Sequence, residues 1–178
     1  MIRRCERDAV ELSDAWAESE EDEVCMPTGK KPFTLQAYLE QHGIESFSDV
    51  LDASEPRPAG SAPREEKKNY AERLSDSYAV LIANELREYF PGVLPNEDGT
   101  GNESPARTGK GVKMLDVNYS NPQLGLGLGV SVKTLNYRDP KTKRYTKNPT
   151  RLDNELRAEA MDYHDRQPFA VMAAVVLV

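Results

Sequence analysis

The clearest pattern in the chain is a helical repeat of apolar residues between positions 70 and 90. They recur three or four residues apart, at Leu74, Tyr78, Leu81, Ile82, Leu86, Tyr89 and Phe90. That spacing places them on one face of an α-helix. Pro91 and Gly92 follow directly and are typical of a helix end. The pattern predicts a helix over residues 70–90.

The strand-like runs lie after this helix. Residues 112–119 and 130–136 favour two neighbouring strands, and Thr150 can cap a helix that runs from Arg151 to about Arg166. The apolar run FAVMAAVVLV (169–178) then predicts a strand covered on both faces, in the centre of a mixed or parallel sheet. The order helix, two or three strands, helix, strand predicts an α/β fold in which helices flank a mixed central sheet.

Glycines and polar residues separate these elements. The segment GLGLG (125–129) precedes a strand and does not open a helix, so it favours a bulged strand or a close backbone approach over a dinucleotide-binding loop. The loop at residues 96–111 is long, polar and rich in glycine. Loops of that length are usually functional or mobile.

The N-terminal third has a different character. Helical spacing is weak around Trp16 and clearer at residues 35–39 and 47–51, and residues 54–68 are rich in proline, glycine and charge. We therefore expect a mostly helical, acidic segment over residues 1–58, a linker over 59–69 and a catalytic core over 70–178.

Composition narrows the class of protein. The 178 residues suffice for one catalytic domain, and 38% hydrophobic with 30% charged residues is typical of a soluble protein. No apolar run is long enough to span a membrane, and no secretion signal opens the chain. Cys5 and Cys25, without a histidine cluster, predict neither a disulfide framework nor a zinc site. These features favour a cytoplasmic protein.

The net charge of −7 is unevenly distributed. Residues 1–58 are strongly acidic, whereas residues 104–151 hold only two carboxylates, Asp116 and Asp139, among ten basic residues: Arg107, Lys110, Lys113, Lys133, Arg138, Lys141, Lys143, Arg144, Lys147 and Arg151. Local fields steer a polyanion more than the summed charge does. Apart from Lys133, these basic residues are our predicted DNA-binding set; a lysine-rich loop that only aids solubility is the alternative.

Candidate chemistry lies within this basic region. Asp116 is in the first strand-like run, and Ser131 and Lys133, two residues apart, share one face of the next. A carboxylate can hold Mg²⁺ against a phosphodiester while a lysine orients the attacking water or offsets developing charge. The alternative is a set of solvated surface charges.

Asp116 on one strand and x-Lys at the end of the next, within this order of elements, resembles the PD-(D/E)xK nuclease superfamily, which has a restriction-endonuclease-like core. The resemblance covers residues 70–178. The family commonly has an acidic residue two positions before the lysine, where this chain has Ser131. Some type II restriction enzymes share the Ser-x-Lys variant and take the missing carboxylate from the following helix and a glutamate from the first helix.

The resemblance implies specific ligands. Glu155 and Glu159, four residues apart on the later helix, and Glu85 on the first helix would complete the metal shell around Asp116. We rank Glu155 first because it is nearer the basic loop; surface salt bridges are the alternative for each glutamate. Asp116, Ser131, Lys133 and Glu155 are the predicted catalytic set, Mg²⁺ is the expected cofactor, and Mn²⁺ is expected to substitute for it.

The function that follows is a Mg²⁺-dependent endonuclease that hydrolyses DNA in restriction or antiphage defence. The alternative is a catalytically inactive subunit of a defence complex that keeps the nuclease fold and binds DNA or protein. The acidic N-terminal segment would be the dock for a protein partner, and a homodimer would suit cleavage of both strands. The sequence specifies neither a recognition sequence nor whether the substrate is DNA or RNA.

Overall fold

The computed structural model describes residues 34–178 except 136, 139–141, 143–144 and 146–147. These residues belong to a compact unit that runs from Pro32 to Val178. The helix expected around Trp16, residues 1–33 of the acidic N-terminal segment and the predicted DNA-binding residues Lys141, Lys143, Arg144 and Lys147 lie outside the described residues.

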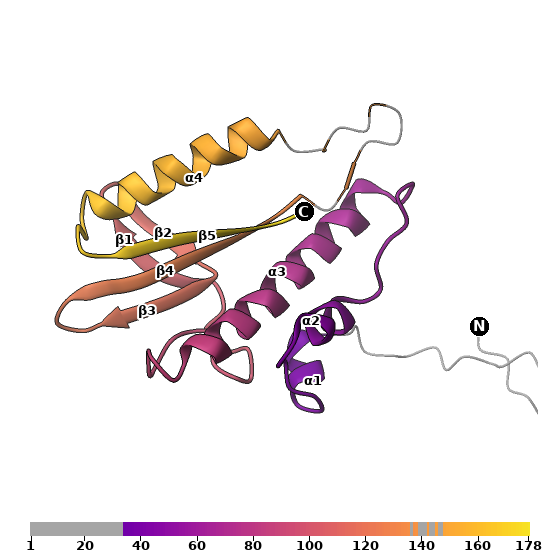
Figure 1. Ribbon diagram of the computed structural model, residues 1–178, viewed down its shortest axis with the longest axis horizontal. Coiled ribbons are helices and arrows are strands. Elements are labelled where there is room, and N and C mark those ends of the chain that lie inside the picture. Colours follow the sequence, from indigo (N-terminus) through magenta and orange to yellow (C-terminus); the bar gives the residue numbers. More distant parts are fainter. Residues whose placement is uncertain (1–33, 136, 139–141, 143–144, 146–147) are drawn as a thin grey trace, which may run out of the picture. The chain divides into compact units, whose positions relative to one another are not determined.

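The described residues form four helices and five strands (Figure 1). In chain order these are α1 (Leu35–Leu39), α2 (Phe47–Ser54), α3 (Arg64–Leu86), β1 (Ser104–Thr108), β2 (Gly111–Leu115), β3 (Val117–Asn121), β4 (Gly125–Thr134), α4 (Pro149–His164) and β5 (Val171–Leu177).

Helix α3 is the expected long helix, but it begins six residues earlier than the apolar repeat indicated. Its first turns carry charged side chains and follow Pro63, so they add no apolar positions to the pattern. Further along, α3 contributes to two apolar clusters. Tyr70, Leu74 and Val80 pack with residues of the α1–α2 region, whereas Ala79 and Ala83 pack against the sheet.

The short helices α1 and α2 are stabilised by side-chain caps and pack on α3. Thr34 caps α1, and Ser46 with Asp49 forms a capping box at the start of α2. Val50 and Ala53 of α2 are buried in the same cluster as Tyr70 of α3. The helices α1 and α2, which we grouped with the N-terminal segment, therefore pack in one cluster with α3 of the expected core.

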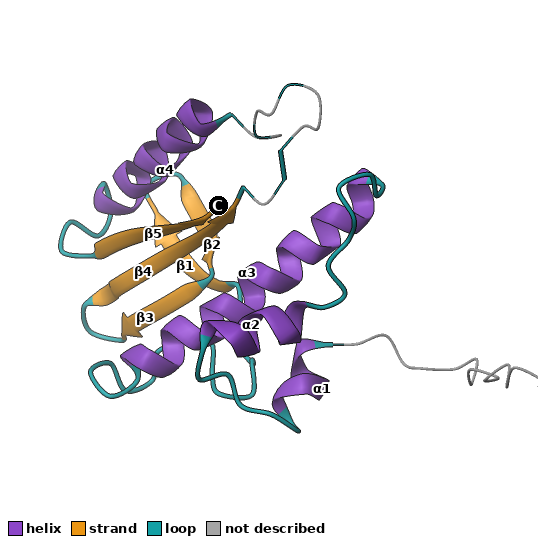
Figure 2. Cartoon of the chain, turned by 45° about the vertical axis from the view of Figure 1, so that its right-hand side comes forward, coloured by secondary structure: helices purple, strands orange, loops and turns teal. Residues whose placement is uncertain are grey.

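The strands form two small sheets, so the expected α/β class is confirmed (Figure 2). β1 and β2 form an antiparallel hairpin. The other sheet has the order β3-β4-β5, with β3 antiparallel and β5 parallel to β4, which makes it mixed as expected. The hairpin occupies part of the segment that we expected to be one long loop, because Ser104–Thr108 carries no large apolar residue to mark a strand.

The expectation that residues 169–178 form a central strand is wrong, although side chains on both faces of this strand pack in apolar clusters. β5 lies at the edge of its sheet, and Val171 is 60% exposed. Met172 and Val175 point to opposite faces and pack in different clusters. An uninterrupted apolar run shows that both faces are apolar, but it does not show whether a neighbouring strand lies on each side.

The glycine-rich segment is a bulged strand, as expected. Register shifts where Tyr119 pairs with Leu128 and Ser120 with Leu126, so Gly127 is the extra residue. Leu126 and Leu128 are two residues apart and would share a face of a regular strand. Here Leu128 packs with the α3 cluster and Leu126 with the cluster that contains Tyr163 of α4. The bulge lets one strand supply both cores.

Helices α3 and α4 cover opposite faces of the sheet. Val117 and Val130 pack against α3, whereas Tyr163 of α4 packs with Leu115 and Met172. α4 starts two residues earlier than expected because Asn148, not Thr150, caps it, and Pro149 occupies its first turn. None of the helices in the described part of the chain has the length and apolar character needed to cross a bilayer.

Candidate active site

Asp116 lies at the break between β2 and β3. The pairing of β3 with β4 begins at Val117 and Val130, so β4 has no β3 partner beyond that point. The backbone N–H of Val132 faces this open edge and donates a hydrogen bond to Asp116 Oδ2 at 2.7 Å. The carboxylate thus satisfies a backbone donor at the edge of the sheet, which fixes its orientation.

Asp116 and Lys133 line the same pocket, between α3 and the end of β4. The pocket has a volume of about 850 Å³. Its lining comes from α3, from the start of β1, from the end of β4 and from Tyr137 beyond it. The structure therefore brings together the two residues on which the phosphodiesterase prediction depended most.

The pocket changes the acidity of Asp116. Burial raises the pKa of this carboxyl group above its ordinary value, and the negative charge of Glu159 raises it further. The Val132 N–H and the Lys133 ammonium act in the opposite direction. A carboxylate whose charge is poorly solvated is well suited to bind a cation or a proton.

Asp76 of α3 is the site residue that our sequence reasoning missed. It lines the same pocket, and Asn102 Nδ2 donates to its Oδ1 at 2.8 Å. Burial is the largest cause of its raised pKa; the Asn102 hydrogen bond lowers the pKa, and the charges of Glu103 and Asp116 raise it. Two half-buried carboxylates in one pocket repel each other, so a cation between them would stabilise both.

Glu85, which we selected on α3, is exposed and does not line this pocket. It follows Asp76 by nine residues, or two and a half turns at about 3.6 residues per turn, so it lies on the opposite side of the helix. The sequence pattern that could have indicated Asp76 is its helical spacing of four from Glu72 and of eight from Lys68. Glu85 was selected instead because apolar residues flank it.

Of the two glutamates on α4, Glu159 is the one directed to the site. The buried hydroxyl of Ser131 donates to Glu159 Oε1 at 3.3 Å, and Glu159 contributes to the raised pKa of Asp116. The side chain of Glu155 is 58% exposed and pairs with Arg151 at 2.7 Å. The structure thus reverses our ranking of these two residues.

Tyr163 adds a buried hydroxyl on the α4 side of Asp116. The residue is fully buried, and its hydroxyl has no hydrogen-bond partner among the described residues. Burial raises its pKa to about 12, with smaller contributions from the charges of Glu159 and Asp116. The group therefore stays protonated at neutral pH and can only be a donor to these carboxylates.

The groups near Asp116 that could bind a cation are the carboxylates of Asp76 and Glu159, and carboxylate oxygens are the ligand type that Mg²⁺ prefers. Within the described ranges, no three Asp, Glu, His or Cys side chains lie close enough together to enclose a metal ion. Mg²⁺ usually takes one or two protein carboxylates and completes its shell with water and substrate phosphate. Asp116 with one further carboxylate, Asp76 or Glu159, fits that requirement.

The predicted DNA-binding residues are dispersed. Lys110 and Lys113 both contact Asp162 at 2.8 Å, and Arg151 pairs with Glu155. Arg138 lies over the ring of Tyr145, 4.6 Å from its centroid. Arg107 is exposed, and its carbonyl accepts a hydrogen bond from Gln167. None of these side chains lines the pocket of Asp116.

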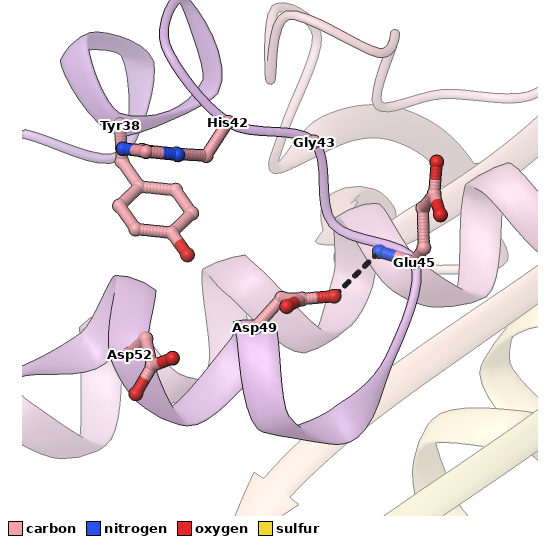
Figure 3. A pocket seen from close by; sticks show the side chains of 6 residues that line it. All are labelled: Tyr38, His42, Gly43, Glu45, Asp49 and Asp52. Atoms are coloured by element: carbon pink, nitrogen blue, oxygen red, sulfur yellow. Dashed lines mark hydrogen bonds between the residues drawn. The ribbon is translucent and has the colours of Figure 1, made fainter.

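A second pocket, of about 630 Å³, lies between α1 and α2 (Figure 3). Asp49 is its central carboxylate, and it accepts from the backbone N–H of Glu45, as the dashed line in Figure 3 shows. The Ser46 hydroxyl and the N–H groups of Glu45 and Ser46 lower the pKa of Asp49. These contacts belong to the capping box of α2, so the carboxylate has a structural role.

Comparison of the chain with known proteins gave no match among family models, curated proteins or solved structures. The geometry of the pocket is therefore the basis on which a function can be inferred.

Proposed function

We propose that this protein is a metal-dependent endonuclease that hydrolyses DNA through the pocket of Asp116. The observation that carries the proposal is the pairing of Asp116, fixed by the Val132 N–H, with Lys133 and Asp76 in one open pocket. A half-buried acid pair beside a lysine suits a reaction in which a phosphodiester and a divalent cation must be held together.

The order of elements supports a restriction-endonuclease-like core. A long helix precedes the strands, Asp116 and Lys133 belong to successive strands β3 and β4 or their boundaries, and α4 leads to β5 parallel to β4. Ser131 still departs from the common acidic motif. Its hydrogen bond to Glu159 supports a carboxylate contributed by α4 in its place.

Each residue has a definite role in the proposed reaction. Asp116, with Asp76 or Glu159 as the second carboxylate, would hold Mg²⁺, which polarises the scissile phosphate and lowers the pKa of a bound water. Lys133 would orient the attacking water and offset the charge that develops on the phosphate. Ser131 would position Glu159. The attacking water gives up a proton to solvent and its oxygen forms the new bond to phosphorus, while the bond to the leaving sugar oxygen breaks and that oxygen takes up a proton from solvent.

A plasmid-nicking assay with Mg²⁺, Mn²⁺ or EDTA tests the proposal. We expect metal-dependent nicking by the full chain and its loss in Asp116→Asn and Lys133→Ala. Asp153→Asn is the matched control, because Asp153 is an exposed acid that pairs with Arg157 on the outer side of α4. Nicking that survives both site variants would contradict the assignment.

The α4 ligand is tested by a second pair of variants. Glu159→Gln should reduce the rate by a factor on the order of 100 or more if it completes the catalytic arrangement, whereas Glu155→Gln should leave the rate within about twofold. Equal loss in both variants would contradict a selective role for Glu159.

The alternative is an inactive subunit with a nuclease fold. DNA binding that needs no metal, without nicking under any of the metal conditions, would favour it. Restriction or antiphage defence is the expected setting of the active enzyme. It predicts that expression in a bacterial host lowers phage plating efficiency and that Asp116→Asn abolishes this protection.

A further inference from the structure

One stripe of α3 forms a wall of the pocket of Asp116. The residues on it follow helical spacing of three and four: Arg64, Lys67, Lys68, Ala71, Glu72, Ser75 and Asp76. The end of β4 lies opposite, with Val132, Lys133 and Thr134 in the lining. The pocket therefore continues along the first half of α3 and is not confined to the surroundings of Asp116.

Charge is sorted along this wall. The basic residues Arg64, Lys67 and Lys68 occupy the first turns, and the carboxylates Glu72 and Asp76 follow nearer to Asp116. From residue 64 to residue 76 the helix rises about 18 Å at about 1.5 Å per residue. One strand of B-DNA carries a phosphate about every 3.4 Å along its axis, so the wall matches the length of about five phosphates.

The basic residues of the wall are accessible to a ligand. Within the described residues Arg64 makes no ion pair or hydrogen bond through its side chain. Lys68 pairs with Glu72 at 3.1 Å, but both side chains are more than half exposed, and such surface pairs are weak. Lys67 is held in place, because it donates to the carbonyl of Gly60 and lies 5.2 Å from the centre of the Tyr137 ring.

Four of the predicted DNA-binding cations that the structure describes, Lys110, Lys113, Arg138 and Arg151, contact other side chains. Lys110 and Lys113 both pair with Asp162, whose side chain is only 10% exposed. The guanidinium of Arg138 stacks on Tyr145 and donates to its hydroxyl at 2.7 Å. Binding of phosphate to these groups would first have to break contacts within the protein.

We propose that the first turns of α3 are the surface on which a DNA duplex lies, with Arg64 and Lys68 bound to phosphates that flank the one held at Asp116. This inference rests on the proposed nuclease function and identifies where its substrate binds. Lys67 contacts Tyr137 and holds this part of the pocket in place. The carboxylates Glu72 and Asp76 lie further along α3, where the cation would bind.

Binding of a fluorescein-labelled 20-base-pair duplex by the full chain, measured by fluorescence anisotropy in EDTA, tests the inference without cleavage. Arg64→Gln and Lys68→Gln are compared singly and together over a range of salt concentrations. Arg157→Gln is the matched control, since Arg157 is an exposed base of α4 whose partner is Asp153. Thermal melting shows whether each variant is folded.

If the wall binds phosphate, each substitution lowers the magnitude of the salt slope by about 1. The double variant then binds up to about 60-fold more weakly at 0.1 M salt, and the Arg157 control is unchanged. A folded double variant that binds the duplex with the affinity and salt slope of the wild type would overturn the inference. The nuclease proposal would still stand. Failure of the wild type to bind the duplex, or preference for RNA, would overturn the choice of DNA as substrate.

Discussion

Asp116 combines a structural hydrogen bond with a raised pKa. Its carboxylate accepts the hydrogen bond of a strand-edge N–H from Val132, and burial raises its pKa. For a carboxyl group with a raised pKa, the folded protein binds the proton more readily than the unfolded chain does. Stability is therefore lost as pH rises through the interval between the unfolded and folded pKa values.

We predict that Asp116→Asn raises the melting temperature at neutral pH. The amide oxygen can still accept from Val132, while the charge that burial destabilises is removed. The difference from wild type should narrow as pH falls below the ordinary range of an aspartic acid, where both proteins are uncharged at this position. Thermal melts at several pH values measure it.

Added Mg²⁺ provides the matching test at the same residue. It should stabilise the wild type and have little effect on Asp116→Asn, because a ligand stabilises only the protein that binds it. Without added metal, a melting temperature of Asp116→Asn below that of the wild type at neutral pH would show that the negative charge of Asp116 is stabilising. It would contradict the predicted effect of burial.

The sequence predicted some of the site residues and not others for definable reasons. Asp116 and Lys133 could be found because each is a charged residue at a strand end. Glu155 and Glu159 share a helix face, so only the tertiary contact with Ser131 distinguishes them. Asp76 lies in a polar stripe that looks like a solvated helix surface until the pocket beside it is known.

Strand β4 depends on close backbone approach at its glycines. A Cβ atom at Gly129 would lie 2.8 Å from Leu115 Cδ1 and 3.0 Å from Met172, both in the cluster under α4. At Gly127 it would lie 3.1 Å from Tyr119. The glycines thus bring neighbouring elements together where a side chain would separate them.

We predict that Gly129→Ala lowers the free energy of unfolding by about 1–3 kcal/mol, the usual cost of overpacking a core. In a protein of this size that corresponds to a fall in melting temperature on the order of 2–9 °C. Gly60→Ala is the control, because nothing lies within 4 Å of a Cβ atom there. Equal melting temperatures for Gly129→Ala and the control would contradict the close approach.

Element prediction succeeded where periodicity was strong. The long helix, the strand that contains Lys133 and the helix after residue 148 all exist, with shifted ends. The single strand expected over residues 112–119 is instead interrupted at Asp116 and divided between β2 and β3. Hairpin β1–β2 was hidden because its first strand, Ser104–Thr108, has small and polar residues and derives its stability from pairing with β2. Such pairing is a non-local property that no single run of residues shows.

Across the whole molecule, α4 is joined to the hairpin by charge as well as by apolar contacts. Asp162 binds Lys110 and Lys113, and its backbone carbonyl accepts from the N–H of Gly109 at 2.7 Å. Hydrogen bonds from the two lysines lower the pKa of Asp162. For a carboxyl group with a lowered pKa, the stabilisation is present above the unfolded value and is lost as pH falls through the folded value.

We predict that Asp162→Asn speeds hydrogen exchange in residues 104–115 and leaves the exchange of α3 unchanged. The apolar contacts of Tyr163 keep the fold, so the effect should stay local. Exchange mass spectrometry at neutral pH measures it, with Asp153→Asn as the control. Acceleration throughout the chain would indicate global destabilisation and would contradict a local clamp.

For the molecule as a whole, the order of the strands in the sheet was the property that the sequence predicted least well. The apolar run at residues 169–178 is compatible with a central or an edge strand, since the sequence records which faces are apolar and not which edges are paired. The parallel pairing of β5 with β4 follows from the crossover through α4, which a pattern of elements can suggest. The exposed outer edge of β5 cannot be read from it.

The break at Asp116 has a mechanical consequence. The hairpin ends at Leu115 and the mixed sheet begins at Val117, so Asp116 lies between a residue of the cluster under α4 and a residue of the cluster under α3. A movement of Leu115 relative to Val117 would change the backbone torsions of Asp116. A substrate or partner that shifts the hairpin relative to β3 would therefore change the direction in which the Asp116 carboxylate points.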